Sequence, residues 1–352
     1  MTTEELSHVV SNGWRRYLPW LNLILIVVLI SAGFWYLSSR IGLAAIAETI
    51  AAGEMGYVLL AAAIMVLTIV IKGFRWQLMF TASPTPIRFS TAFWATALGQ
   101  YVNLIIPFFR LGEVARLYAL NQETGTAPAQ TLGTLVLEKT LELIFFGLTV
   151  VAIVPFVILP DTVSQSWPVL VAVPIVLLIA LILLAYRTRW IIELWRMVIA
   201  PLPDRLNQRL ERVMTLGLEG LSSLRNKRLS MLLILLSLVI AVLSVLLSYA
   251  LFPALDLPLT ILDASLVHIV VTLAITPPST PAKIGVFNGA AALLLWSLGL
   301  TDEAAIASYA ILLYLVVVVP QVTLGIVAAS RSSWRWQTAM RALERQEEGR
   351  PS

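Results

Sequence analysis

Cysteine is absent from this chain of 352 residues, and histidine occurs only twice, as His8 and His268. The absence of cysteine excludes disulfide bonds, thiolate metal sites and cysteine nucleophiles. Two histidines are too few for a histidine metal cluster. The sequence also lacks a Walker loop, a nucleophile elbow and a His-rich metal motif. We therefore expect neither an enzyme nor a bound cofactor, and these absences disfavour an ATP-driven pump.

Charged residues are scarce as well, because they make up 12% of the chain against 59% hydrophobic residues. A soluble domain is about one quarter charged, so this composition indicates a polytopic membrane protein. The apolar segments run from end to end, and we expect an all-α helical bundle that forms a single membrane domain over residues 1–352. The pI near 9.5 comes from basic loops that flank apolar segments, which argues against a nucleic-acid partner.

Six apolar segments are long enough to cross the ~30 Å hydrocarbon core of a bilayer. They lie at residues 18–37, 56–80, 129–155, 167–186, 229–251 and 304–329. Surface helices are expected at residues 4–20 and 42–54. Two further apolar stretches, residues 89–120 and 263–298, contain breaks that prevent one continuous helix.

The two breaks share an order of residues. The stretch from Gln100 to Arg116 is interrupted by Pro107 and Gly112, and residues 276–288 contain a proline-rich break. In each case a basic residue, an aliphatic residue and glycine follow the prolines. Broken backbone at bilayer depth is tolerated only where protein buries it or water reaches it, and charged residues there usually face a cavity or a partner. We expect the rest of the chain to be a scaffold for these two breaks.

The positions of Lys and Arg predict which loops face the cytoplasm. Basic loops stay on the cytoplasmic side, and they lie at residues 72–88, 187–228 and 331–350. If residues 89–120 crossed the membrane completely, nine basic residues of the second loop would face outside. Both broken stretches are therefore predicted to be re-entrant hairpins, the first entering from the cytoplasm and the second from outside. This topology predicts a multi-pass protein of the plasma (inner) membrane with both termini in the cytoplasm.

The predicted elements repeat with inverted orientation. Residues 1–160 have the order span, span, re-entrant hairpin, span and begin inside, whereas residues 167–330 have the same order and begin outside. Two such halves form an inverted-topology repeat, in which broken elements meet near the midplane and build the substrate site. The basic loop at residues 187–228, which contains an expected interfacial helix, lies on the cytoplasmic side together with the tail at residues 331–352.

Basic residues beside the breaks are candidates for anion binding. We expect Arg110, Arg116 and Lys283 to hold an anionic headgroup, because guanidinium suits bidentate contact with phosphate. Thr280 is predicted as the N-cap of the helix after the second break, where the helix dipole adds to the positive charge. The opposing interpretation is that Arg110, Glu113 and Arg116 only neutralise one another and fix the hairpin.

Polar residues on the apolar arms extend this candidate site. Gln100 and Asn103 are expected either to line a cavity or to bond the broken backbone. His268 lies in the apolar arm of the second hairpin, and a lone histidine there is more often a packing residue than a proton relay.

Two acids on the span at residues 129–155 need compensation. Glu138 and Glu142 lie one helical turn apart, so their charges repel unless protons or cations compensate them. They are either a proton-coupling pair or counter-ions, and the counter-ion interpretation is favoured. The basic residues involved in these two interpretations are Lys139, Arg75, Arg110 and Arg116.

Several motifs occur in an order that resembles a known family. They are Arg75-Trp76, residues 103–113 followed by Arg116, Glu138-Lys139 followed by Glu142, and residues 281–287. Together they resemble the lysylphosphatidylglycerol synthase transmembrane-region family, also called flippase-like domain proteins. The resemblance covers nearly the whole chain and implies a prokaryotic membrane protein related to the lipid-translocating part of multiple peptide resistance factors. We expect no aminoacyl-transferase domain, because the chain ends soon after its last span.

The chain departs from the family pattern at three places. The family often has Gly-Gly where this chain has Ala282-Lys283, and often Glu where it has Asn288. The acid of the fourth span is often Asp with a preceding Arg, and here these residues are Glu142 and Lys139. The resemblance and the charged breaks together predict a translocase that moves an anionic phosphate-bearing lipid, a phospholipid or a polyprenyl phosphate, between leaflets. The alternatives are a non-transporting membrane partner or regulator of a lipid or glycan enzyme, and a small-solute or ion transporter.

Overall fold

The computed structural model describes most of the chain between residues 43 and 331. The described residues are 43–81, 86–106, 111–153, 156, 167–186, 193, 208, 210–211, 215–218, 222–277 and 280–331. Every regular element in these ranges is a helix, which confirms the all-α fold class. The predicted helix at residues 4–20, the predicted span at residues 18–37, most of the 187–228 loop and nearly all of the 331–352 tail lie outside the described residues.

The described α-helices agree closely with the predicted segments. In chain order they are α2 (Leu43–Ala52), α3 (Met55–Met79), α4 (Phe89–Ile105), α5 (Leu111–Thr124), α6 (Pro128–Ile153), α8 (Trp167–Tyr186), α11 (Lys227–Ala254), α12 (Ile261–Ile275), α13 (Val286–Ser297) and α14 (Glu303–Arg331). Two short 3₁₀ turns, η3 (Ser222–Arg225) and η4 (Pro281–Lys283), lie among them. Both stretches predicted to be broken are indeed broken, between α4 and α5 and between α12 and α13.

Three of the described helices are long and apolar enough to cross a membrane, namely α3, α11 and α14. They contain 25, 28 and 29 residues, or roughly 38 to 44 Å at 1.5 Å per residue. Helix α6 has 26 residues but carries three charged side chains near its middle, whereas α8 has 20 residues and no charge. The site therefore lies among helices of membrane-spanning length.

The ends of several helices follow from local side chains. Helix α4 ends at Ile105 because the residue before a proline, here Ile106, is disfavoured in the helical region. The side chain of Asn226 accepts hydrogen bonds from two backbone N–H groups at the start of α11. Thr260 and Asp263 form a capping box at the start of α12. These signals fix where the hairpin arms begin and end.

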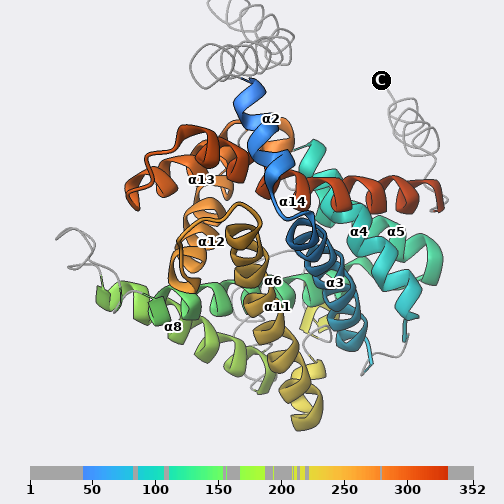
Figure 1. Cartoon of the computed structure of the whole chain (residues 1–352). Coiled ribbons are helices and arrows are strands. Elements are labelled where there is room, and N and C mark those ends of the chain that lie inside the picture. The colour runs from blue at the N-terminus through green and yellow to red at the C-terminus, as the bar shows by residue number, and fades with distance from the viewer. Residues whose placement is uncertain are drawn as a thin grey trace, which may run out of the picture.

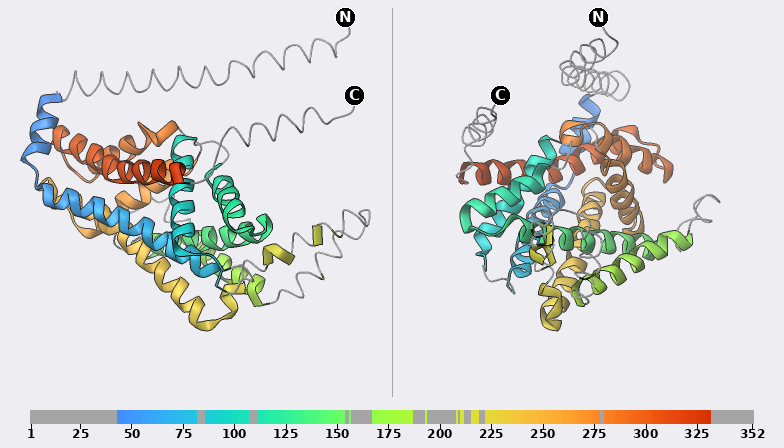
Figure 2. Two further views of the ribbon diagram at one scale, coloured as in Figure 1. Left: turned by 90° about the vertical axis from the view of Figure 1, so that its right-hand side faces the viewer. Right: turned by 180° about the vertical axis from the view of Figure 1, so that it is seen from behind.

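The centre of the fold is the packed pair α3 and α11. Helices α4 and α5 lie on one side of this pair and α12 and α13 on the other, as Figures 1 and 2 show from opposite faces. Helix α14 packs against α3, α4 and α13, and α8 packs against α6. The main apolar core is contributed by α3, α4, α11, α12, α13 and α14, with Leu251, Phe252 and Tyr309 among its most buried side chains.

Helices α4 and α5 form a close antiparallel pair. A Cβ added to Gly99 would lie 2.6 Å from the side chain of Arg116 and 2.9 Å from the backbone oxygen of Gly112. A Cβ added to Gly112 would collide with the backbone of Gly99 and the side chain of Asn103. Because both positions lack a side chain, the two helices touch along their backbones, and the polar residues of α5 are held directly against α4.

The second break differs from its prediction. Helix α13 begins at Val286 with Gly285 as its N-cap at φ 83°, so the predicted N-cap at Thr280 is wrong. The Thr280 hydroxyl instead donates to the Ile284 carbonyl at 2.6 Å. Ala282 and Lys283 have φ of 53° and 59°, the left-handed region in which residues other than glycine are strained. The helix therefore starts later, because these two residues turn the backbone first.

Candidate functional site

Charged and polar side chains from five helices meet beside the α4–α5 hairpin. Helix α3 contributes a lysine, an arginine and a tryptophan, and α11 contributes a serine. Helix α5 contributes a glutamate and an arginine, and α6 contributes two glutamates and a lysine. Their hydrogen bonds and ion pairs join residues that are far apart in the sequence, and we refer to this set as the charge cluster. Its charged members are Lys72, Arg75, Glu113, Arg116, Glu138, Lys139 and Glu142.

The most buried ion pair of the cluster joins Arg116 to Glu138. Both terminal nitrogens of Arg116 donate to the two carboxylate oxygens of Glu138, at 2.9 and 2.8 Å. The two side chains are 6% and 3% exposed. Such a bidentate contact has the geometry of a strong charge-assisted pair. It fastens α5 to α6, and a lipid could reach the Arg116 guanidinium only after this pair had opened.

An aromatic side chain supports the same arginine. The guanidinium carbon of Arg116 lies 4.1 Å from the centroid of the Trp76 ring, which is a cation–π contact. Trp76 is fully buried, and its indole N–H donates to the Thr134 hydroxyl at 3.2 Å. Arg116 also donates to the Thr96 hydroxyl at 3.3 Å. Helices α3, α4, α5 and α6 are thus joined around one guanidinium.

A second arginine connects α3 to α6 and α11. Arg75 is 1% exposed, donates to the Ser237 hydroxyl at 2.9 Å and pairs with Glu142 at 3.2 Å. Glu138 and Glu142 thus each have an arginine partner, which is the arrangement expected of counter-ions. The geometry accounts for both acids without a shared proton.

The outer part of the cluster is more accessible. Lys139 bonds Glu142 at 2.9 Å and approaches Glu113 to 3.7 Å, and Lys72 approaches Glu142 to 3.7 Å. The side chain of Lys139 is 41% exposed and that of Lys72 is 27% exposed. These lysines are therefore the cations of the cluster that an incoming anion reaches first.

Glu113 and Asn103 fix the start of α5. The Asn103 amide donates to Glu113 at 3.1 Å, and its oxygen accepts the backbone N–H of Gly112 at 2.7 Å. Asn103 therefore bonds the broken backbone, as one of its two predicted roles required. Glu113 turns toward Asn103 and Lys139, and Arg116 toward Glu138, so the structure does not contain the expected neutralising pair of Glu113 and Arg116. Arg110 lies outside the described residues.

The charges of the cluster do not balance. Its four cations are Lys72, Arg75, Arg116 and Lys139, and its three carboxylates are Glu113, Glu138 and Glu142. One positive charge is therefore in excess among the described residues. Uncompensated charge at bilayer depth is costly, so this excess favours the binding of one negative charge.

Some buried donors of the site have no hydrogen-bond partner in the described part of the chain. They are the Nε atoms of Arg75 and Arg116 and the amide nitrogen of Gln100. Gln100 lies on the face of α4 that also carries Thr96 and Asn103, which both contact α5. Buried polar groups are normally paired, so these donors indicate room for water or a ligand between the helices. Within the same ranges no group of acids or histidines is suited to hold a metal.

The second break lies against the first hairpin. The η4 turn, which contains Lys283, packs against α4. The Tyr314 hydroxyl of α14 donates to the Ala282 carbonyl at 2.9 Å and so holds the strained turn in place. His268 of α12 lies edge-on to Phe146, with their ring centroids 6.3 Å apart. Thr280 bonds only within its own turn among the contacts described above.

Sequence reasoning missed several members of the cluster. Lys72 and Trp76 were expected at the membrane interface, and Thr96 and Ser237 were not singled out. Their roles depend on contacts between helices, and no spacing within the sequence predicts those contacts. One signal was present: Lys72, Arg75 and Trp76 are three or four residues apart and therefore share a face of α3.

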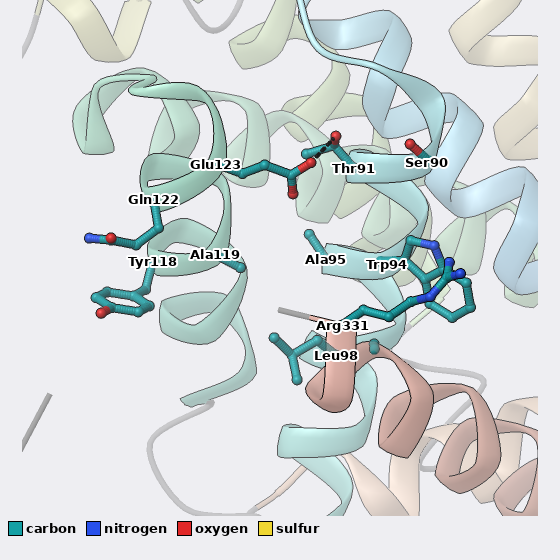
Figure 3. Close-up of a pocket in the computed structure, with 11 residues that line it drawn as sticks. Ser90, Thr91, Trp94, Ala95, Leu98, Tyr118, Ala119, Gln122, Glu123 and Arg331 are labelled. Atoms are coloured by element: carbon teal, nitrogen blue, oxygen red, sulfur yellow. Dashed lines mark hydrogen bonds between the residues drawn. The ribbon is translucent and has the colours of Figure 1, made fainter. Parts of the chain in front are cut away.

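A cavity of about 460 Å³ lies near the charge cluster, between α4, α5 and α14. It opens where α4 begins and where α5 and α14 end (Figure 3). Its walls combine the apolar residues Trp94, Ala95 and Leu98 with the charged residues Glu123 and Arg331. The sequence analysis did not predict this cavity, because α4 and α14 are far apart in the chain.

Comparison with known proteins supports the family resemblance. Residues 23–325 match the family model described as the lysylphosphatidylglycerol synthase TM region, and no other domain is detected. A comparison with curated proteins gives no match. The matched region is a membrane domain associated with lipid modification or flipping, so the chain is a multi-pass membrane protein. With more than half of its residues matched, the chain belongs to the lysylphosphatidylglycerol synthase transmembrane-region family.

Proposed function

We propose that this protein moves a lipid with an anionic phosphate headgroup between the leaflets of the plasma (inner) membrane. The excess positive charge of the charge cluster carries the proposal. A phosphodiester has one negative charge, so its arrival neutralises a cluster in which four cations face three carboxylates. A neutral, filled site at bilayer depth is favoured over a charged, empty one.

The accessible lysines are the first binding residues in this mechanism. Lys139 and Lys72 are exposed enough to exchange a carboxylate oxygen for a phosphate oxygen. Arg75 and Arg116 are buried and held by Glu142 and Glu138, so they position the helices and contact the phosphate only if their pairs open. Each exchange replaces one ion pair with another, which keeps the desolvation cost of the moving charge low.

The lengths of the broken elements support two re-entrant hairpins. Helices α4 and α5 have 17 and 14 residues, and α12 and α13 have 15 and 12. At 1.5 Å per residue, every arm is shorter than the ~30 Å hydrocarbon core. The η4 turn of the second hairpin packs against α4 of the first. In our proposal the hairpins enter from opposite sides, and the lipid headgroup passes between them.

The pattern of helix contacts supports an inverted repeat. If α3 corresponds to α11, the first hairpin to the second and α6 to α14, each contact has a counterpart. Helix α4 packs against α3 and α14, and α12 packs against α11 and α6. The equivalent helices α3 and α11 pack on each other at the centre, as expected around a two-fold axis. Together with the masked first span and α8, this gives six spans and two hairpins in the proposed topology.

Leaflet-resolved transport of a fluorescent phospholipid in proteoliposomes tests the proposal. We expect Lys139→Gln and Lys72→Gln each to slow transport at least about tenfold, the equivalent of one charged hydrogen bond. The Arg110→Gln and Lys283→Gln variants should also be slower, because both remove positive charge beside a break. The matched control is Lys227→Gln, which neutralises an exposed lysine at the first residue of α11.

Thermal stability of each variant separates transport from folding. Loss of transport in the lysine variants with an unchanged melting temperature supports the proposal. Full transport by all four neutralised variants would show that the charges are structural. Absence of transport by the wild-type protein with every phosphate lipid would favour the alternative of a non-transporting partner of a lipid or glycan enzyme.

A further inference from the structure

The cavity between α4, α5 and α14 has two charged walls that do not satisfy each other. Arg331 is the last residue of α14, and Glu123 is in the last turn of α5. Figure 3 shows them on separate sides of the cavity, each beside a different residue of α4. In the part of the chain that the structure describes, Arg331 has no carboxylate partner and Glu123 has no cationic partner. The cavity therefore presents one positive and one negative group to a ligand.

The positive wall is held in place by an aromatic ring. The guanidinium carbon of Arg331 lies 4.8 Å from the centroid of the Trp94 ring. This cation–π contact orients the planar group and leaves its N–H edges available. A guanidinium presented in this way suits two hydrogen bonds to phosphate oxygens.

The negative wall is held by a hydroxyl group. Thr91 is buried, and its hydroxyl donates to one carboxylate oxygen of Glu123 at 2.7 Å. The second carboxylate oxygen makes no hydrogen bond to a described residue. A carboxylate is an acceptor only, so this oxygen suits a ligand that donates a hydroxyl or ammonium hydrogen.

We propose that this cavity binds the headgroup of a phospholipid whose phosphodiester carries a hydrogen-bond donor. The phosphate pairs with Arg331, the donor group bonds Glu123, and the glycerol end meets the apolar surface of Trp94, Ala95 and Leu98. A phosphate monoester without a donor fits less well, because its extra negative charge would face Glu123. The cavity thus distinguishes donor-bearing phospholipids from choline lipids and polyprenyl phosphates.

This inference deepens the proposed function, since it names the lipid class that enters the transport path. It rests on that function only for the later movement of the lipid. The cavity opens at the end of the molecule where α4 begins, which the proposed topology places on the cytoplasmic side. Binding and transport are measured separately, so either claim can fail alone.

Titration of purified protein with short-chain lipids, followed by native mass spectrometry, tests the binding claim. The probes are dihexanoyl phosphatidylethanolamine, phosphatidylglycerol and phosphatidylcholine, together with geranyl phosphate. We expect the wild-type protein to bind the ethanolamine lipid, the glycerol lipid or both about tenfold more tightly than the choline lipid and geranyl phosphate. Preference for the ethanolamine lipid identifies an ammonium as the donor, and preference for the glycerol lipid identifies a hydroxyl.

Two variants assign the contacts. Glu123→Ala should abolish the preference for donor-bearing lipids and leave binding of the choline lipid unchanged. Arg331→Gln should weaken binding of all three phospholipids about tenfold. Arg88→Gln is the matched control, because Arg88 is exposed at the same end of α4 but does not line the cavity. Equal wild-type affinity for all four probes, or unchanged binding by both variants, would overturn the proposal.

Discussion

Replacement of the Arg116–Glu138 pair by apolar residues should show how strongly the charge cluster is coupled. Arg116→Leu leaves the Glu138 carboxylate buried without a partner, and Glu138→Leu leaves the guanidinium in the same state. Removal of one member of a buried pair typically costs about 3–5 kcal/mol. Both side chains are nearly inaccessible and share two short hydrogen bonds. We therefore expect each single variant to lose about 3–5 kcal/mol of unfolding free energy.

The double variant should be much less damaged than the sum of the two single variants. With both charges removed, no unpaired ion remains, and an apolar pair of similar volume is often neutral or stabilising. Arg116 also loses its contacts with Trp76 and Thr96, and we allow about 2 kcal/mol for these. The double variant should therefore unfold within about 2 kcal/mol of the wild type.

The assay is reversible unfolding in mixed detergent micelles, followed by far-UV circular dichroism. Thr96→Val is the control, because it removes only the 3.3 Å hydrogen bond and should cost about 1 kcal/mol or less. A coupling energy near 3 kcal/mol or above fits the structure. Additive effects within about 0.5 kcal/mol would refute the reasoning, because they would mean that the two residues do not interact.

Three further predictions concern packing, strain and topology. Gly112→Ala should destabilise the α4–α5 hairpin by about 2 kcal/mol in the same unfolding assay, because its Cβ would meet the backbone of Gly99; Gly289→Ala, where a Cβ meets nothing within 4 Å, should be neutral or stabilising, and equal losses would count against the tight hairpin. Ala282→Gly should raise the melting temperature by relieving about 1 kcal/mol of left-handed strain, and a lower melting temperature would contradict the turn geometry. On the cysteine-free background, Ala129→Cys should react with an impermeant thiol reagent only from the cytoplasmic side and Thr301→Cys only from outside; labelling of both from one side would exclude opposed hairpins.

Sequence reasoning predicted the helices well because membrane segments are read from long apolar runs and their interruptions. Pro107 ended α4 as expected, since a proline disfavours helix at the residue before it. The same reasoning failed at the second break. Thr280 and Pro281 have the residue types of a helix start, but the backbone turns left-handed at Ala282 and Lys283 before the helix begins. No side chain there signals that conformation, although the glycines often found in the family at these positions are explained by it.

The site was predicted in kind but not in detail. The need of Glu138 and Glu142 for cations followed from their spacing, because two acids one turn apart repel. The assignment of Arg116 to one and Arg75 to the other required the packing of α3, α5 and α6. The contact of Arg331 with Trp94 joins the last described helix to the first hairpin and likewise depends on tertiary structure.

Leaflet-resolved lipid movement by the wild-type protein tests the central claim most directly. Liposomes that carry a fluorescent phosphatidylglycerol or phosphatidylethanolamine are treated with an impermeant quencher, with and without reconstituted protein. We predict that the protein removes the protected inner-leaflet fraction for these lipids and that empty liposomes retain it. An unchanged protected fraction, with folded protein in the membrane and both lipids tested, would contradict lipid translocation by this fold.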